Sequence, residues 1–162
     1  MYEYIVLDTE TTGIDKYNDE ILQLSIIDQD GKVLFNHYLK PTHTESWDRA
    51  MQVNHISPKM VATEKPISDY SDEINRILSE AKVIIGYNVS FDLGMLEGSG
   101  IRIPWEKRTV DVMKEFAPIY GDFKGYGSRH GSRHGSRQNR RSCAILCGDK
   151  VSSQRRAGGR SR

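Results

Sequence analysis

The chain has 162 residues, enough for one domain with a hydrophobic core. Its net charge of +1 is the sum of an acidic first part and a basic second part. Residues 1–124 hold 13 Lys and Arg against 21 Asp and Glu, whereas residues 125–162 hold 10 Lys and Arg against one Asp. The acidic first part argues against a broad nucleic-acid-binding surface built from it, and suits a site that reaches phosphates through cations. No apolar run is long enough for a membrane span or a signal peptide, so we expect a cytoplasmic protein.

Patterns typical of strands and helices alternate along the first 124 residues. Apolar runs separated by turn signals predict three antiparallel strands at the start, and the segment from Pro41 to Asn54 is expected to be irregular. The helix predicted from Ser68 or Asp69 to Ala81 has one apolar stripe, which we interpret as core packing. The predicted strands are 5–10, 20–28, 33–39, 82–86 and 108–111, and the predicted helices are 58–62, 68–81, 90–98 and 112–120. This order favours an α/β fold with a mixed sheet flanked by helices.

Two acidic residues follow the first apolar run, in the stretch Asp8-Thr9-Glu10-Thr11-Thr12-Gly13. In a strand, Asp8 and Glu10 share one face, about 7 Å apart along the strand, and Thr9 points to the other face with Leu7. Two carboxylates at the end of a buried strand are costly to hold together without a positive charge, and a divalent cation fits best because it prefers oxygen ligands. The alternative for this pair alone is two solvated acids at a strand end.

A third acidic residue follows the predicted strand 82–86, in the stretch Asn88-Val89-Ser90-Phe91-Asp92. Ser90 is typical of an N-cap, which would place Asp92 in the first turn of a helix. The positive end of the helix favours an ionised carboxylate there, so Asp92 is predicted to stay charged and to serve as a metal ligand. The alternative is that Asp92 only caps its own helix.

These two stretches resemble the first two motifs of the DnaQ-like (DEDD) 3′–5′ exonucleases. That family includes the proofreading subunit of bacterial DNA polymerase III, RNase T and oligoribonuclease. The resemblance covers residues 1–123 and implies a ribonuclease H-like fold in which the first strand is central and Asp92 lies next to Asp8. It also implies hydrolysis of single-stranded DNA or RNA from the 3′ end, with release of nucleoside monophosphates, and a DNA polymerase as a candidate partner.

The same resemblance implies roles for individual residues. Three would be catalytic and would bind two Mg²⁺ or Mn²⁺ ions: Asp8, Glu10 and Asp92. Three would contact the terminal nucleotide: Thr11, Asn88 and His55. For His55, an ordinary surface-loop histidine is the alternative.

The family's third motif, His-x4-Asp or Tyr-x3-Asp in a late helix, is absent from the sequence after Phe123. Asp149 is the only acidic residue there, and Ala144 and Ile145 occupy the positions where the motif has His or Tyr. One metal ligand and the residue that orients or deprotonates the attacking water are therefore missing. We expect a C-terminally truncated, marginally stable version of the fold with strongly impaired activity.

From residue 125 the composition changes to Gly-Ser-Arg-His repeats followed by an Arg-rich stretch. Such a sequence cannot bury enough apolar surface to fold, so residues 125–162 are predicted to be a disordered basic tail beside the exonuclease-like domain 1–124. A shifted reading frame would produce an abrupt change of this kind.

Three roles for the tail stay open. It could bind zinc, although the ligand spacing is not that of most zinc sites; the candidate ligands are His130, His134, Cys143 and Cys147. Its arginines could hold nucleic acid nonspecifically through phosphates, which would suit a non-catalytic nucleic-acid-binding protein. It could also be a solvated segment with no role.

Overall fold

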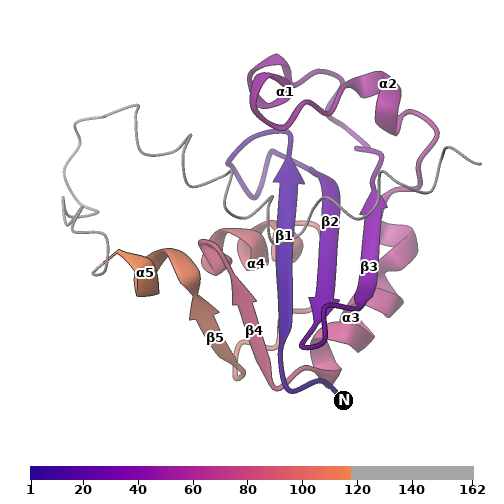
Figure 1. Ribbon diagram of the computed structural model, residues 1–162. Helices are drawn as coiled ribbons and strands as arrows, with labels where there is room; N and C mark the ends of the chain where they lie inside the picture. The colour runs from indigo at the N-terminus through magenta and orange to yellow at the C-terminus, as the bar shows by residue number, and fades with distance from the viewer. Residues whose placement is uncertain (118–162) are drawn as a thin grey trace, which may run out of the picture. The chain divides into compact units, whose positions relative to one another are not determined.

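The computed structural model of this chain describes residues 1–117. The predicted tail with its candidate zinc ligands, the expected place of the third motif and the end of the predicted helix 112–120 lie outside the described residues. Within them, five strands form one mixed sheet in the order β3-β2-β1-β4-β5 (Figure 1). The strands are β1 (Ile5–Thr11), β2 (Ile21–Asp28), β3 (Val33–Tyr38), β4 (Val83–Gly86) and β5 (Arg108–Asp111).

Strand β1 lies at the centre of the sheet. It pairs antiparallel with β2, and β2 pairs antiparallel with β3, which confirms the predicted meander. On its other side β1 pairs in parallel with β4, and β4 with β5. The pairing with β4 runs only through Ile5 and Val6, whereas β2 follows β1 as far as Thr11. The edge of β1 that faces β4 is therefore open from Asp8 onwards, and another element can approach it.

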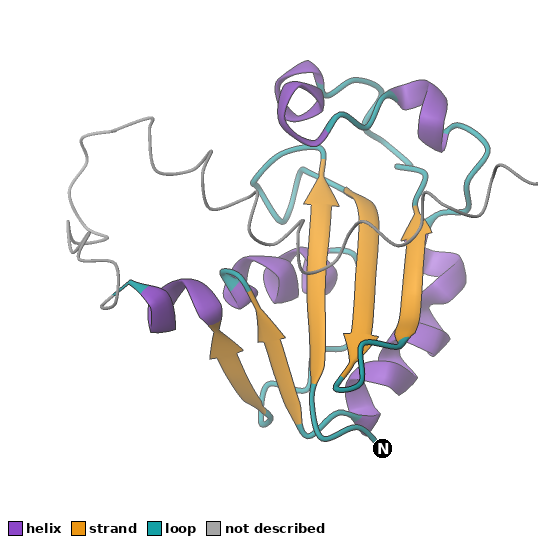
Figure 2. Ribbon diagram, in the orientation of Figure 1, coloured by secondary structure: helices purple, strands orange, loops and turns teal. Residues whose placement is uncertain are grey.

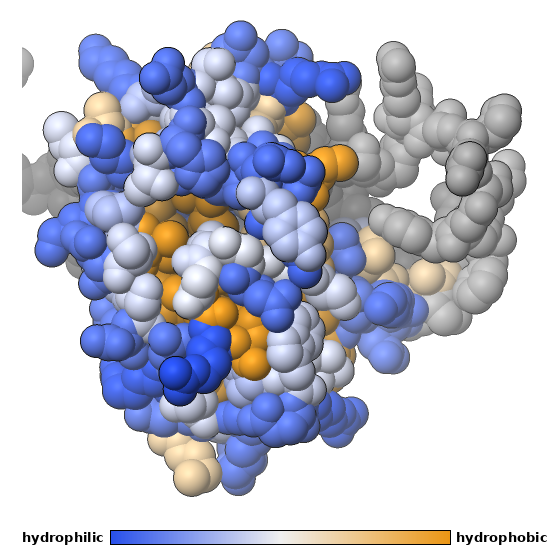
Figure 3. Space-filling model, turned by 180° about the vertical axis from the view of Figure 1, so that it is seen from behind, coloured by the Kyte–Doolittle hydropathy of each residue, from blue (hydrophilic) through white to orange (hydrophobic). Residues whose placement is uncertain are grey.

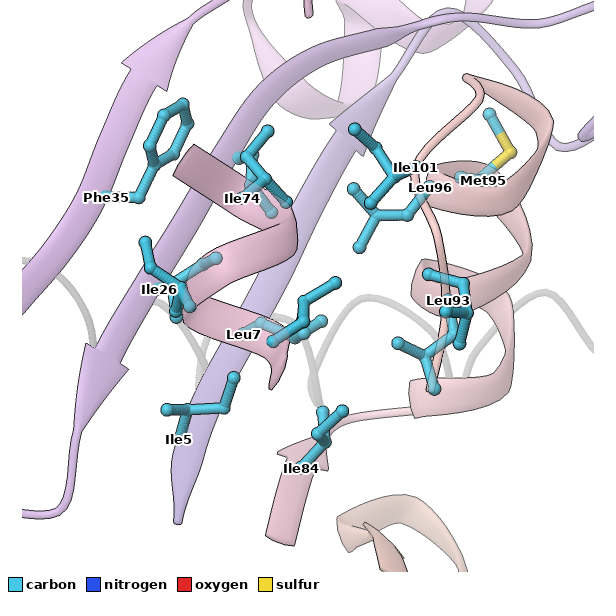
Figure 4. Close-up of a cluster of buried hydrophobic side chains, with 14 of the residues drawn as sticks. Ile5, Leu7, Ile26, Phe35, Ile74, Ile84, Leu93, Met95, Leu96 and Ile101 are labelled. Atoms are coloured by element: carbon cyan, nitrogen blue, oxygen red, sulfur yellow. The ribbon is translucent and has the colours of Figure 1, made fainter. Parts of the chain in front are cut away.

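Two helices cover one face of the sheet. They are α3 (Ser71–Glu80), which continues from the 3-10 helix η1 (Ile67–Tyr70), and α4 (Val89–Gly98) (Figure 2). The predicted apolar stripe of α3 is buried and packs with Ile5 and Leu7 of β1 in one core cluster (Figure 4). Each fully buried aliphatic side chain of this kind contributes about 1.5–3 kcal/mol. In the view from behind, hydrophobic residues lie near the middle of the surface and hydrophilic residues surround them (Figure 3).

The opposite face of the sheet carries Val6, Asp8 and Glu10. These side chains are half-buried and alternate with the buried Ile5, Leu7, Thr9 and Thr11, as the strand period predicts. Among residues 1–117, no helix crosses this face (Figure 2). Asp8 and Glu10 therefore lie on the face of the described sheet that α3 and α4 do not cover.

The segment from Pro41 to Asn54 is not irregular throughout, because it contains helix α1 (Asp48–Asn54). The N-cap position is Trp47, and no side chain caps the helix, so the sequence lacks the usual start signal. A tertiary contact fixes this region instead. The Trp47 ring is 5% exposed, and its Nε1 donates a 2.7 Å hydrogen bond to the carbonyl of Ile56.

A second, smaller core supports α1 and the following helix α2 (Pro58–Val61) beyond the end of β1 (Figure 1). It consists of Leu22, Trp47, Ile56 and Val61. The last helix of the described chain, α5 (Val112–Phe116), begins directly after β5. No helix in residues 1–117 has the length and apolar character needed to cross a membrane.

Candidate active site

The N-terminus of α4 fills the open edge of β1. Strand β4 ends at Gly86, and the chain turns through Asn88 in the left-handed region (φ 62°) before α4 begins at Val89. Asparagine tolerates this backbone conformation better than most residues because its short polar side chain can bond locally. The turn brings the first turn of α4 beside β1 at the level where β4 no longer pairs with it. This is how Asp92 reaches the motif that carries Asp8.

Asp92 is held by the residue between the two acids of β1. Its Oδ1 accepts a 2.6 Å hydrogen bond from the Thr9 hydroxyl and a 3.1 Å hydrogen bond from the Thr9 backbone N–H. The Asp92 side chain is 2% exposed. Its second oxygen, Oδ2, is also buried and accepts no hydrogen bond from the described chain. Asp92 is therefore fixed through one oxygen, and the other is left for a different partner.

In the chain without a cation, the surroundings of Asp92 oppose the ionisation that the sequence predicted. Burial raises the pKa of Asp92 to about 7, and the negative charge of Asp8 acts in the same direction. The two hydrogen bonds from Thr9 lower the pKa but do not outweigh these effects. The negative charge of Asp8 thus acts on Asp92, whereas the proximity of the three acids that the family resemblance implied stays a prediction.

Ser90 is not the N-cap of this helix. The cap position is Asn88, no side chain caps it, and Asp92 binds Thr9. The turn is fixed from β5 instead, because the Asp111 Oδ1 accepts 3.1 Å hydrogen bonds from the backbone N–H groups of Asn88 and Met113. Asp111 thus joins the start of α4 to the start of α5. It is 9% exposed, and its Oδ2 lies 3.4 Å from the Lys114 ammonium.

Thr11 and the loop that carries His55 lie side by side at the end of β1. The Asn54 side-chain amide donates a 3.1 Å hydrogen bond to the Thr11 carbonyl, and its oxygen accepts one from the Ile56 backbone N–H. His55 follows in the left-handed region (φ 61°), and it is exposed. The structure therefore brings two of the three predicted nucleotide contacts to one place.

The glycine that ends the β1 motif allows the next loop to close tightly. A Cβ atom on Gly13 would lie 2.2 Å from the Asp19 carboxylate, so a larger residue would push this loop away. The Thr12 hydroxyl also donates a 3.1 Å hydrogen bond to the same carboxylate. The Thr-Thr-Gly sequence thereby fixes the path of the chain at the end of β1.

No group of three or more His, Cys, Asp or Glu side chains in residues 1–117 is arranged as a metal-binding cluster. The convergence of Asp8, Glu10 and Asp92 on shared cations therefore stays a prediction. The residues nevertheless fit a divalent cation, because the buried Oδ2 of Asp92 has no donor in the described chain and a hard cation prefers carboxylate oxygens. Surface hollows occur beside Trp47 and beside Lys107, and neither is lined by these three acids.

Sequence reasoning missed two residues that shape the site. Thr9 was expected only to face the core with Leu7, and Asp111 was expected only to end a strand. The alternation of β1 places Thr9 on the α4 side, but the hydrogen bond to Asp92 depends on where β4 stops. The Asp111 side chain caps α5 through Met113, which is a recognisable N-cap position, whereas its bond to Asn88 is a tertiary contact without a local signal.

A family model for exonucleases of the RNase T type matches residues 5–130. The chain therefore belongs to this exonuclease family, the DnaQ-like (DEDD) family that its first two motifs indicate. Members of the family generally use divalent metal ions. The match covers the whole described sheet and the three acidic residues discussed above.

PolC-type DNA polymerases III are among the proteins that are similar to this chain in sequence. The PolC-type DNA polymerase III of Thermotoga petrophila is 28% identical over 116 residues, 68% of this chain and 8% of that protein. The PolC-type DNA polymerase III of Lacticaseibacillus paracasei is 32% identical over 98 residues, 59% of this chain and 7% of that protein. The chain thus spans less than a tenth of the length of these relatives.

Solved structures of exonuclease I share the fold. Exonuclease I in complex with the inhibitor BCBP superposes with a TM-score of 0.62 at 19% identity, over 72% of this chain and 30% of that chain. E. coli exonuclease I in complex with a dA16 oligonucleotide superposes with a TM-score of 0.60 at 18% identity, over 74% of this chain and 30% of that chain. The mixed sheet with flanking helices is therefore the ribonuclease H-like fold that the sequence predicted.

Proposed function

We propose that this chain is a 3′–5′ exonuclease that removes nucleoside monophosphates from single-stranded DNA or RNA, at a strongly reduced rate. The observation that carries the proposal is the environment of Asp92. Its carboxylate is buried, one oxygen is fixed by Thr9, and the other has no donor in the described residues. A buried carboxylate with a raised pKa and one oxygen that lacks a donor is typical of a site that is completed by a cation.

The side chains of Asp8, Glu10 and Asp92 would hold two Mg²⁺ or Mn²⁺ ions. When bound, these ions would lower the pKa of a water molecule and neutralise charge on the scissile phosphate. Asp92 would give up its proton on binding, because a metal ligand must be deprotonated. The loop of Asn54 and His55, together with Thr11 and Asn88, would bind the terminal nucleotide at the end of β1.

The reduced rate follows from the missing third motif. A positioned general base typically contributes about 10²–10⁴ to the rate, and the sequence after Phe123 supplies neither that base nor the fourth acid. Asp8, Glu10 and Asp92 remain to bind cations, so weak turnover is expected.

The test is release of mononucleotides from single-stranded DNA labelled at either end, with and without Mn²⁺. We expect slow, Mn²⁺-dependent loss of the 3′-terminal nucleotide, abolished by Asp8→Ala and unchanged by the exposed control Asp30→Asn. Product that forms equally in Asp8→Ala would show that the activity does not belong to this site. Turnover as fast as that of an intact family member would refute the impairment.

A non-catalytic nucleic-acid-binding protein is a second candidate, favoured by the charge of residues 125–162, which hold 10 Lys and Arg against one Asp. Binding of nucleic acid through these basic residues would survive removal of divalent cations with EDTA. The two functions are therefore distinguished by their response to EDTA.

A further inference from the structure

We propose that Thr9 is a positioning residue for the cation site: its hydroxyl and backbone N–H hold Oδ1 of Asp92, so that Oδ2 is the oxygen presented to a divalent cation. This inference rests on the proposed function. It assigns a role to a residue that lies between the two acids of the β1 motif and is not itself a candidate ligand.

Thr9 holds Asp92 in a defined geometry. Both Thr9 donors reach the same oxygen, at 2.6 Å from the hydroxyl and 3.1 Å from the backbone nitrogen. Two donors from one residue fix both the position of the carboxylate and its rotation about the bond to its Cβ atom. Oδ1 is therefore occupied by the two hydrogen bonds, and the direction in which Oδ2 points is fixed as well.

Both Thr9 and Asp92 are buried. Thr9 is 8% exposed and Asp92 is 2% exposed, so water does not readily compete for these hydrogen bonds. The unpartnered Oδ2 is buried as well, and leaving a buried acceptor without a partner is unfavourable. A cation at Oδ2 would remove this penalty, and Thr9 would not need to move when it binds.

The contact between Thr9 and Asp92 depends on how far β4 pairs with β1. The β4 strand leaves β1 after Val6, so the Thr9 N–H has no partner in β4, and Asp92 takes that place. The hydroxyl then adds a second bond, which only Ser or Thr could supply from this position on a strand. Supporting partners of this kind typically affect metal affinity by about 10- to 100-fold.

The experiment measures Mn²⁺ binding to the full chain by isothermal titration calorimetry at pH 8. Thr9→Val removes the hydroxyl and keeps the shape and the backbone N–H, so we expect affinity to fall about ten-fold, the lower end of that range. Thr9→Ser restores the hydroxyl and should bind within about two-fold of the wild type. Thr109→Val, at an exposed position of β5, is the matched control and should change nothing.

Combining Thr9→Val with Asp92→Asn separates positioning from a general structural effect. Once the carboxylate is gone, Thr9→Val should cause no further loss of affinity. If Thr9→Val does not fold, as judged by circular dichroism, Thr9→Ala provides the same test and should show the same loss.

Equal Mn²⁺ affinity in the wild type and in Thr9→Val would overturn the role of Thr9 and leave the proposed function intact. Loss of affinity in Thr9→Ser equal to that in Thr9→Val would also overturn it, because the hydroxyl would then be irrelevant. Absence of saturable Mn²⁺ binding by the wild type would overturn both this inference and the metal-dependent function.

Discussion

The surroundings of Asp92 act in opposite directions on the protonation of its side chain. Thr9 donates two hydrogen bonds that favour the charged carboxylate, whereas burial and Asp8 favour the neutral acid and raise its pKa to about 7. Without a cation, burial and Asp8 outweigh the hydrogen bonds from Thr9, so Asp92 titrates near neutral pH. A cation would reverse the balance because it interacts only with the charged form.

This balance predicts how stability depends on pH when divalent cations are absent. The pKa of Asp92 is raised from an ordinary value of 3.8 to about 7, so between those values the unfolded chain releases a proton that the folded chain keeps. The contribution of Asp92 to the free energy of unfolding therefore falls as the pH rises through this window. The penalty reaches the order of 4 kcal/mol at pH 8.

Asp92→Asn removes the titrating group and should remove this penalty. In EDTA, urea unfolding should show the variant more stable than the wild type at pH 8 and similar to it near pH 4. Excess Mn²⁺ at pH 8 should stabilise the wild type more than Asp92→Asn, because the variant lacks one ligand and binds the ion more weakly. A wild type and a variant with the same pH dependence in EDTA would contradict this account.

At the level of elements, carboxylates fix the ends of strands and helices around the site. Asp111 lies at the end of β5 and accepts hydrogen bonds from Asn88, before α4, and from Met113, in α5. Since Asn88 adopts the left-handed conformation, its position depends on this contact with a neighbouring strand. The turn that delivers Asp92 is therefore supported from β5 as well as from β1.

Asp111→Ala should destabilise the domain by about 2 kcal/mol, since it removes an N-cap and leaves the Asn88 N–H without its acceptor. Asp111→Asn keeps an acceptor oxygen and should lose less stability than Asp111→Ala. Urea unfolding of the wild type and the two variants measures the order of their stabilities. An alanine variant as stable as the wild type would show that the contact does not support the turn.

The elements also show what the sequence could and could not predict. Apolar runs separated by turn residues predicted the meander and the bounds of β5, because those signals are local. Helix α1 was not predicted because no side chain caps its start, and the contact of the buried Trp47 that stabilises it is tertiary. The start of α4 was placed too late because Asn88 in the left-handed conformation, fixed by a distant Asp111, replaced the expected Ser90 cap.

For the candidate site, strand alternation predicted that Asp8 and Glu10 share one face of β1, whereas their convergence with Asp92 stays a prediction. The charge state of Asp92 could not be predicted, since it depends on burial that only the packed structure reveals. The role of Thr9 was missed for the same reason.

On the scale of the whole molecule, charge is divided along the chain. Residues 1–124 hold 13 Lys and Arg against 21 Asp and Glu, and residues 125–162 hold 10 against one. The acidic part repels nucleic acid unless cations intervene, whereas the basic part attracts it directly.

Deletion of residues 125–162 should therefore weaken binding of single-stranded DNA in EDTA and reduce the dependence of that binding on salt concentration. Fluorescence anisotropy at several salt concentrations measures both quantities. Binding that is unchanged by the deletion would mean that the basic segment does not hold nucleic acid.

The central claim is that Asp8 and Asp92 hold a divalent ion together. The most direct measurement is an anomalous difference map from a crystal soaked with Mn²⁺ and a nucleoside monophosphate. We predict a Mn²⁺ peak within coordination distance of both carboxylates, with Oδ2 of Asp92 as the ligand atom. A fully occupied Mn²⁺ peak elsewhere, with none at these two residues, would contradict the account.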